Sequence, residues 1–242
     1  MSTPKSTPRK STPDEIRRRF DQDVERFSNL EAGQSATMDA PLTLDLIARA
    51  AAAVNPRADR LLDIGCGAGN YTLKLLQFLP LRDVTLIDLS RPMLDRAMER
   101  IAAAASLKVS AVQCDIRDAT LPAEAFDVAV AAATLHHLRT EDEWVRVFGA
   151  VHQALTPGGS FWISDLVAHQ NPAIEELMGR RYGEYLAALK GAEYRDQVFR
   201  YIAAEDTPRP LAWQLELLRA SGFRSVEVLH KNTCFAAFGA IK

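Results

Sequence analysis

The chain has few cysteines and no long hydrophobic run. Cys66, Cys114 and Cys234 are its three cysteines, and they lie far apart among 242 residues. Their number and spacing fit neither a disulfide framework nor a CxxC metal pair. No apolar run approaches the roughly 20 residues that a helix needs to cross a bilayer, and the N-terminal residues carry no apolar signal segment. We therefore expect free thiols and a cytoplasmic location.

The chain also lacks a strong excess of either charge. It contains 29 Lys and Arg residues against 31 Asp and Glu residues, for a formal net charge of -2. A broad nucleic-acid-binding face needs clustered basic residues, so this balance argues against one, although a local basic patch stays compatible with it. We expect a small-molecule partner, with no membrane and no nucleic acid.

Metal-binding spacings are missing as well. His152 falls on a predicted helix and His169 in a predicted loop, and neither forms an HExxH pair or another metal-ligand spacing. The sequence therefore predicts no metal site and gives no sign of a metal-dependent mechanism of the catechol type.

The length fits one α/β domain, because a single core stops growing near ~250–300 residues. Residues 1–13 are rich in Ser, Thr and Pro and cannot bury enough apolar surface to offset the entropy of ordering, so we predict a disordered tail. Residues 14–242 are predicted to form a single domain. Within it, we expect residues 14–56 to form an N-terminal helical cover and residues 166–210 to form a helical insert.

Predicted strands and helices alternate through the middle of the chain. The apolar strand candidates are residues 60–64, 84–88, 109–113, 126–132 and 160–165. The helical stretches are residues 14–30, 42–54, 71–79, 92–105, 141–155, 171–204 and 211–221. This alternation predicts a parallel sheet with helices on both faces. The last two strand candidates, residues 224–230 and 233–240, are joined by a short link that predicts an antiparallel hairpin.

The stretch "RLLDIGCGAGN" is a buried strand that runs into a glycine-rich turn. A dinucleotide fingerprint needs G-x-G-x-x-G, and here Asn70 stands at the place of the third glycine. The Gly-Lys-Ser/Thr of a Walker A loop is absent, so phosphate binding is not specifically indicated. The turn alone therefore leaves the ligand open, with a nicotinamide dinucleotide as an imperfect match.

Acidic residues near the strand ends narrow the choice of ligand. Asp88 ends the second strand, where its carboxylate could accept hydrogen bonds from both hydroxyls of a ribose. Asp63 precedes the turn and could receive an ammonium group directly, through water or by orienting the turn, whereas it would repel a pyrophosphate. Asp115 ends the third strand and could accept from an adenine amino group, with Ile116 against the ring. These positions favour an adenosine ligand without phosphate.

Five motifs in order resemble those of class I S-adenosylmethionine-dependent methyltransferases. They are "LLDIGCGAGN", "LIDLS" with "PMLDRA", "QCDIRD", "FDVAVAAATLHHL" and "LTPGGSFWISDL", and together they span about residues 60–165. The resemblance implies a Rossmann-like, seven-stranded, mostly parallel sheet with an antiparallel C-terminal hairpin strand. It also implies S-adenosyl-L-methionine as the cofactor and methyl transfer to a small-molecule acceptor.

The same resemblance implies a cofactor site built from the motif residues. Asp63, Gly65 and Gly67 would surround the amino-acid part of the cofactor, and Ala132 would offer its carbonyl group. The other members implied by the motifs are Cys66, Asn70, Asp88, Leu89, Met93, Asp115 and Ile116. Core packing is the alternative interpretation for Met93 and Ile116.

Outside the motifs, the layout is more weakly similar to that of carboxy-S-adenosylmethionine synthases, which serve wobble-uridine modification in tRNA. That layout suggests a homodimer and an N-terminal helical cover. Gln34 stands where that family has a tyrosine near the cofactor, and we include it in the cofactor site. Arg195 and Arg200 lie near the place of an arginine that grips the additional carboxylate. A carboxylated cofactor and a non-catalytic cofactor-binding protein therefore stay open as alternatives.

Two histidines follow the fourth strand, whose carboxyl end should open onto the ligand crevice. His136 and His137 are candidate catalytic residues, because a histidine there could take a proton near neutral pH. The alternative is a loop common to this family in which one histidine contacts cofactor or backbone. The substrate-site candidates are Asp165, Tyr182, Tyr185 and Arg200, and packing is the alternative for the two tyrosines. Phe20 and Phe27 are expected to cover the cofactor.

Overall fold

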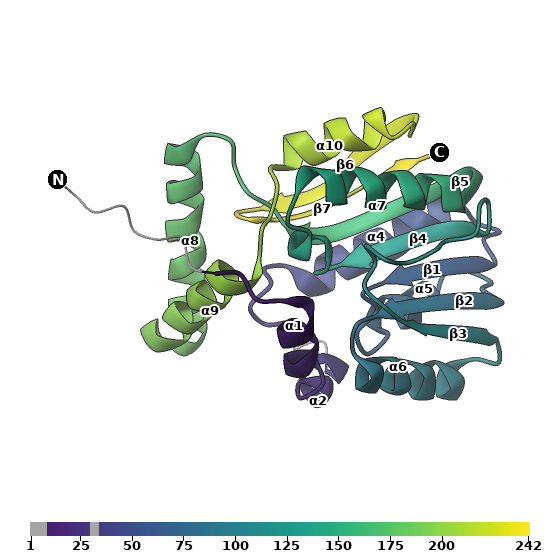
Figure 1. Ribbon diagram of the computed structural model, residues 1–242, viewed down its shortest axis with the longest axis horizontal. Coiled ribbons are helices and arrows are strands. Elements are labelled where there is room, and N and C mark those ends of the chain that lie inside the picture. Colours follow the sequence, from purple (N-terminus) through teal and green to yellow (C-terminus); the bar gives the residue numbers. More distant parts are fainter. Residues whose placement is uncertain (1–8, 30–33) are drawn as a thin grey trace.

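A seven-stranded sheet forms the centre of the computed structural model, which describes residues 9–29 and 34–242 (Figure 1). The strands are β1 (Arg60–Ile64), β2 (Asp83–Asp88), β3 (Lys108–Gln113), β4 (Phe126–Ala132), β5 (Leu155–Leu166), β6 (Ser225–Asn232) and β7 (Phe235–Ile241). Their order is β3-β2-β1-β4-β5-β7-β6, and β7 runs antiparallel to both of its neighbours. The predicted Rossmann-like sheet with its antiparallel C-terminal hairpin is confirmed.

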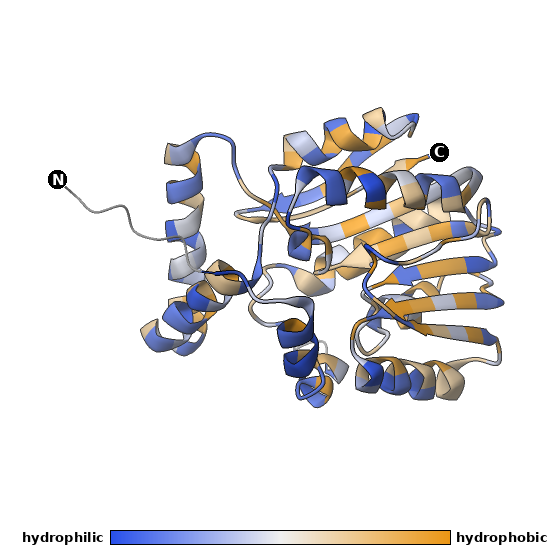
Figure 2. Cartoon of the chain, in the orientation of Figure 1, coloured by the Kyte–Doolittle hydropathy of each residue, from blue (hydrophilic) through white to orange (hydrophobic). Residues whose placement is uncertain are grey.

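Helices cover both faces of this sheet (Figure 1). One face carries α4 (Ala40–Val54), α5 (Asn70–Leu75) and α6 (Arg91–Ala104), and the other carries α7 (Glu141–Ala154) and α10 (Leu211–Ala220). Each face therefore has its own hydrophobic core. The inner strands β1, β4 and β7 are mostly hydrophobic (Figure 2), as burial on both faces requires, whereas the edge strands β3 and β6 are partly exposed.

Two of the predicted helical stretches are divided in the structure. The first becomes α1 (Pro13–Phe20) and α2 (Val24–Ser28), and the insert becomes α8 (Pro172–Lys190) and α9 (Ala192–Glu205). Gly191 separates α8 from α9 with φ +88° and ψ 171°, a conformation outside the helical region that glycine adopts without strain. Propensity alone did not indicate this break, because both flanking segments are good helix formers.

The N-terminal segment is anchored rather than free where the structure describes it. Residues 1–8 lie outside the described part of the chain. The backbone N–H of Ser11 donates to the carbonyl of Ala204 at 3.1 Å, and Lys10 Nζ donates to the carbonyl of Ala203 at 2.8 Å. Thr12 then caps α1. The predicted tail therefore does not extend through residues 9–13, because their polar groups bond to the end of α9.

The insert stands beside the sheet and supports one side of the site. In Figure 1, α8 and α9 project from the body of the molecule next to α1. The hydroxyl group of Tyr182 donates to the carbonyl of Ala36 at 2.8 Å, and Tyr182, Leu186, Leu166 and Phe235 form a small hydrophobic core. Within residues 9–29 and 34–242, no helix combines the length and hydrophobicity that crossing a membrane requires.

Candidate functional site

The chain reverses its direction of winding between β1 and β4. From β1 the sheet continues to β2 and β3 on one side, while β4 and β5 lie on the other. In open α/β sheets, such a reversal opens a crevice at the carboxyl ends of the strands, and ligands bind there. Two adjoining cavities, called cavity A and cavity B below, are lined by residues at this edge of the sheet.

Cavity A, of about 120 Å³, brings together all twelve residues predicted for the cofactor. They are Gln34, Asp63, Gly65, Cys66, Gly67, Asn70, Asp88, Leu89, Met93, Asp115, Ile116 and Ala132. Phe20 and Phe27 from the N-terminal helices also line it, at the place expected for a cover. The sequence motifs thus converge on one cavity from segments that are far apart along the chain.

The glycine turn follows β1 in a backbone conformation that few other residues adopt. Gly65, Gly67 and Gly69 have φ values of +64°, +49° and +80°. A Cβ atom on Gly65 would lie 2.0 Å from Oγ1 of Thr134, so this position has no room for a side chain. The turn therefore approaches the loop after β4 closely and keeps its backbone open to cavity A.

Two carboxyl groups line cavity A from β1 and β2, that of Asp63 buried and that of Asp88 half-buried. Asp88 accepts from the backbone N–H of Gly67 and of Ser90, each at 2.8 Å, and burial raises its pKa to about 6. Asp63 is only 2% exposed and accepts from Oγ1 of Thr72 at 2.6 Å. Burial likewise raises the pKa of Asp63 to about 7. In the ligand-free protein Asp63 thus holds the start of α5 in place.

Asp63 is expected to make the ligand-free protein less stable as the pH rises. Its folded pKa of about 7 exceeds its ordinary value of 3.8, so the folded state holds a proton that the unfolded chain releases between these values. Its stabilising contribution is therefore complete below about pH 4 and is lost as the pH rises through about 7. Asp63→Asn removes this dependence and retains an acceptor for Thr72.

Urea unfolding of both proteins across this pH range measures the effect. We expect the free energy of unfolding of the Asn variant, relative to the unchanged protein, to increase from pH 4 to pH 7. The carboxyl of Asp88 and the hydroxyl of Tyr71 also face this region, and both are identical in the two proteins. A difference that does not vary with pH would show that Asp63 does not titrate in this way.

Asp115 has a partner that sequence reasoning missed. Arg117 lines cavity A, and its Nε and Nη2 atoms lie 2.9 Å and 2.5 Å from the two carboxylate oxygens of Asp115. Arg117 also contacts Glu143 at 3.1 Å. The sequence signal for this ion pair was an acidic and a basic residue two positions apart in "QCDIRD". The carboxylate of Asp115 is therefore already bound on both oxygens before any ligand arrives.

Cavity B is the larger, at about 410 Å³, and it adjoins cavity A. The residues that line both are Phe20, Phe27, Gln34, Tyr71, Ala132, Ala133 and His137. Of the predicted substrate residues, Asp165 and Tyr182 line cavity B. Tyr185 does not, because its hydroxyl donates to the carbonyl of Ser35 at 2.8 Å. Arg200 is exposed and lines neither cavity.

His136 is held between two carboxylates. Its Nδ1 atom bonds to Oδ1 of Asp165, and its Nε2 atom lies 3.6 Å from Oδ1 of Asp206. Burial lowers the pKa of His136, but the charges of Asp165 and Asp206 outweigh this effect and raise it to about 9. In the ligand-free protein His136 therefore carries a proton at neutral pH and has no free lone pair.

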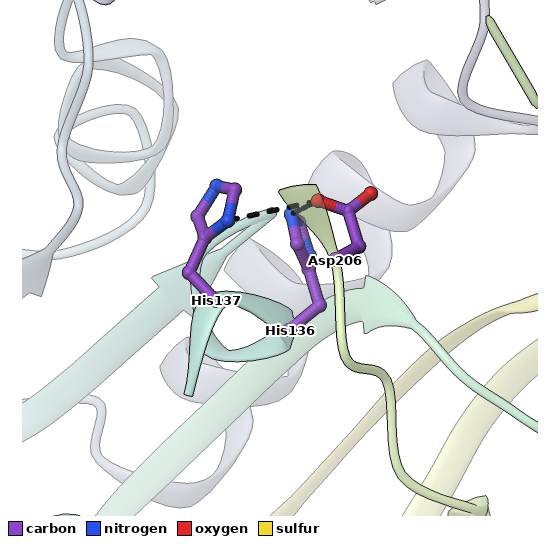
Figure 3. A group of neighbouring side chains, drawn as sticks. All are labelled: His136, His137 and Asp206. Carbon is purple, nitrogen blue, oxygen red and sulfur yellow. Dashed lines mark ion pairs between the residues drawn. The ribbon is translucent and has the colours of Figure 1, made fainter. Parts of the chain in front are cut away.

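His137 lines both cavities and is partly exposed, but its two ring nitrogens are buried. Among the described residues, neither of its ring nitrogens has a hydrogen-bond partner, and Nδ1 lies 3.6 Å from Oδ1 of Asp206 (Figure 3). Burial and the neighbouring charge of His136 hold the pKa of His137 well below its ordinary value. His137 is therefore neutral at pH 7 and keeps an available lone pair. The sequence did not indicate that Asp206 belongs to this site, because it is remote from every motif.

The chain resembles methyltransferases in three comparisons. Residues 61–159 match the family model described as a methyltransferase domain. The chain is 31% identical over 186 residues to carboxy-S-adenosyl-L-methionine synthase of Trichodesmium erythraeum, covering 76% of this chain and 72% of the relative. It is 30% identical over 243 residues to 27-O-demethylrifamycin SV methyltransferase of Amycolatopsis mediterranei, covering 91% and 87%.

The fold resembles that of a solved methyltransferase structure. The structure matches Burkholderia thailandensis 1,6-didemethyltoxoflavin-N1-methyltransferase with a TM-score of 0.63, at 19% identity, over 100% of this chain and 93% of the other. The family model, the extended relatives and the sheet order agree with one another. The chain belongs to the class I S-adenosylmethionine-dependent methyltransferases, and its cofactor is S-adenosyl-L-methionine.

Proposed function

We propose that this methyltransferase binds S-adenosyl-L-methionine in cavity A and transfers its methyl group to a small molecule in cavity B. The observation that supports this most strongly is the shared wall of the two cavities. An acceptor in cavity B would meet the cofactor beside Ala132 and His137, where both cavities are lined by the same residues. Holding the two reactants in line in this way can supply roughly 7–11 kcal/mol of the barrier reduction.

The residues of cavity A fit this cofactor. The cofactor supplies a methyl group on a positively charged sulfur and carries no phosphate. Asp63 and Asp88 would present carboxyl groups to an ammonium group and a ribose. Leu89, Met93 and Ile116 would offer apolar contacts to adenine. Asp115, which Arg117 holds in place, would accept from the adenine amino group through its remaining lone pairs.

The histidines stand at the reaction end of the site. We assign His137 as the group that contacts the nucleophile of the acceptor and takes its proton, because its ring nitrogens are unpartnered at the junction of the cavities. His136 is a positioning residue, fixed by Asp165 on one side. Asp165 in turn accepts from the backbone N–H of Leu135 at 2.8 Å, which ties the histidine loop to β5.

Cavity B favours an aromatic acceptor. Its wall is rich in aromatic side chains, namely Phe20, Phe27, Tyr71, Tyr182, Tyr194, Tyr201 and Phe235. Such rings bind flat apolar molecules by stacking and edge contacts, and a few polar groups then fix orientation. Two relatives are named for methylating small molecules, a demethylrifamycin and a didemethyltoxoflavin. We therefore propose a hydroxylated aromatic small molecule as the acceptor class.

A carboxylated cofactor receives less support from the structure. Arg195 pairs with its neighbour Asp196 at 2.8 Å, and Arg200 is exposed. Neither arginine lines cavity A or cavity B. The described residues therefore offer no arginine from the insert to an additional carboxylate.

An acceptor screen tests the proposed function. The protein is incubated with methyl-labelled S-adenosyl-L-methionine and a panel of hydroxylated aromatic compounds, with primary amines, tRNA and carboxylic acids as comparison classes. We expect label to enter the aromatic compounds and S-adenosylhomocysteine to form in equal amount. Label in tRNA alone, or binding of the cofactor without turnover on any class, would contradict the proposal.

Asp88→Asn is expected to weaken the affinity for S-adenosyl-L-methionine about 10- to 100-fold, because the ribose hydroxyls lose a charged acceptor. Isothermal titration calorimetry measures the change. Asp83→Asn is the matched control, since Asp83 lies at the opposite end of β2 and pairs with Lys108 instead. Equal affinities in the Asp88 and Asp83 variants would show that Asp88 does not hold the ribose.

A further inference from the structure

We propose that His136, His137 and Asp206 bind one divalent transition-metal ion at the junction of cavities A and B. Oδ1 of Asp206 lies 3.6 Å from Nε2 of His136 and 3.6 Å from Nδ1 of His137. The three ligand atoms all lie within 4.8 Å of one another. Figure 3 shows that one ring nitrogen of each histidine, from the loop after β4, faces the same carboxylate oxygen of Asp206, from the segment after α9.

The two separations between Asp206 and the histidines fit a shared metal ion better than they fit direct hydrogen bonds. Two ligand atoms that are each about 2.1 Å from a tetrahedral ion lie about 3.4 Å apart. The observed 3.6 Å exceeds hydrogen-bond distance, and among the described residues neither Oδ1 of Asp206 nor Nδ1 of His137 has a partner. Unpaired buried polar atoms of this kind are costly, and one ion would satisfy both.

His136 is already oriented as a metal ligand. Histidines that bind metals usually donate their other ring N–H to a carboxylate, which fixes the tautomer and the direction of the lone pair. Here Nδ1 of His136 bonds to Asp165, so Nε2 points toward Asp206. A bound ion would displace the proton that Nε2 carries at neutral pH, because a metal binds the deprotonated nitrogen. Asp165 is itself fixed by backbone donors, including the N–H of Leu135 at 2.8 Å and of Leu166 at 2.7 Å. The hydrogen bonds that would orient His136 toward an ion are therefore already present in the structure.

The ligand set indicates both the kind of ion and its use. Two imidazoles and one carboxylate suit ions such as Zn²⁺, Fe²⁺ or Co²⁺, and they leave coordination positions open. The open positions would face cavity B, which His136, His137 and Asp206 all line. Resting on the proposed function, we infer that an acceptor hydroxyl occupies one of them, becomes more acidic there and releases its proton to solvent. Its oxygen then bonds to the methyl carbon as the carbon–sulfur bond of the cofactor breaks. In the loaded protein His137 acts as a ligand, and the ion replaces it as the group that contacts the nucleophile.

Direct metal binding tests this inference without an acceptor. Untagged protein is stripped with a chelator, titrated with Zn²⁺ by calorimetry, and separately loaded with Co²⁺ for visible absorption. We expect one ion per chain and a Co²⁺ spectrum typical of mixed nitrogen and oxygen ligands. His137→Ala and Asp206→Asn should each weaken Zn²⁺ binding at least about 10- to 100-fold, the range found when groups that merely support a ligand are removed.

His169→Ala is the matched control, because it also removes a histidine that pairs with a carboxylate, Glu175, outside the site. We expect this control to bind Zn²⁺ as the unchanged protein does. Equal Zn²⁺ binding by all four proteins, or none by the unchanged protein, would overturn the metal site. Urea unfolding, compared with that of the unchanged protein, confirms that each variant is folded.

Different experimental results would contradict the metal site and the proposed function. Stripped protein that still methylates an aromatic acceptor at the full rate, without binding Zn²⁺ at these residues, removes the metal site and keeps the acceptor proposal. Protein that binds Zn²⁺ through His137 and Asp206 but methylates no compound in the screen keeps the metal site and removes the acceptor proposal.

Discussion

Replacing His137 by alanine is expected to lower the rate of methyl transfer by about 10²- to 10⁴-fold, the usual contribution of a positioned proton acceptor. The reason is its place: it lines both cavities, and its ring nitrogens have no partner among the described residues. Single-turnover kinetics with an acceptor from the screen measure the loss. Affinity for S-adenosyl-L-methionine should stay close to that of the unchanged protein, because the alanine leaves Asp63, Asp88 and the glycine turn intact.

The control for this experiment is His169→Ala, which should keep the full rate. The variant His137→Asn separates the effect of side-chain size from that of proton transfer. Asparagine keeps a polar group at this position but accepts a proton poorly. Full turnover by His137→Ala would contradict its assignment. Loss of cofactor binding together with turnover would instead show that His137 supports cavity A.

Gly65→Ala is expected to lower the free energy of unfolding by about 2–5 kcal/mol. Roughly 1–2 kcal/mol comes from the left-handed backbone conformation and about 1–3 kcal/mol from overpacking. The overpacking arises because the new Cβ would lie 2.0 Å from Oγ1 of Thr134. Relief of this contact would move the turn, so we also expect the affinity for S-adenosyl-L-methionine to fall. Urea unfolding and calorimetry measure the two effects.

Gly67→Ala is the matched variant on the same turn. Gly67 also has a positive φ, but a Cβ there would meet no atom within 4 Å, so only about 1–2 kcal/mol is expected. Adding Thr134→Gly to Gly65→Ala should recover part of the stability by removing the clash. Equal losses for Gly65→Ala and Gly67→Ala, or no recovery in the double variant, would contradict the packing argument.

The sheet and the cofactor cavity were predictable because their signals are local. The inner parallel strands β1 (Arg60–Ile64) and β4 (Phe126–Ala132) are short apolar runs, and both begin and end as expected. Parallel strands place their carboxyl ends at one edge of the sheet, so residues that follow them meet in space. Asp63, Asp88 and Ala132 line one cavity for this reason.

The parts that escaped prediction depend on contacts between distant segments. Asp206 follows a helix of the insert, and it lies beside His136 and His137 because the backbone N–H of Thr207 donates to the carbonyl of His136 at 2.7 Å. No spacing along the chain encodes that meeting, so the sequence did not indicate that these three residues are neighbours. The role of Tyr185 was ambiguous in the same way. Its helical spacing does not reveal that its hydroxyl donates to the carbonyl of Ser35. A homodimer stays a prediction.

A crystal structure with S-adenosylhomocysteine tests the central claim, that cavity A holds the cofactor and opens onto an acceptor in cavity B. We expect the ribose at Asp88, the adenine beside Ile116, and the sulfur next to Ala132 and His137, facing cavity B. A ligand whose sulfur points away from His137, or whose adenine occupies cavity B, would contradict the assignment of the two cavities.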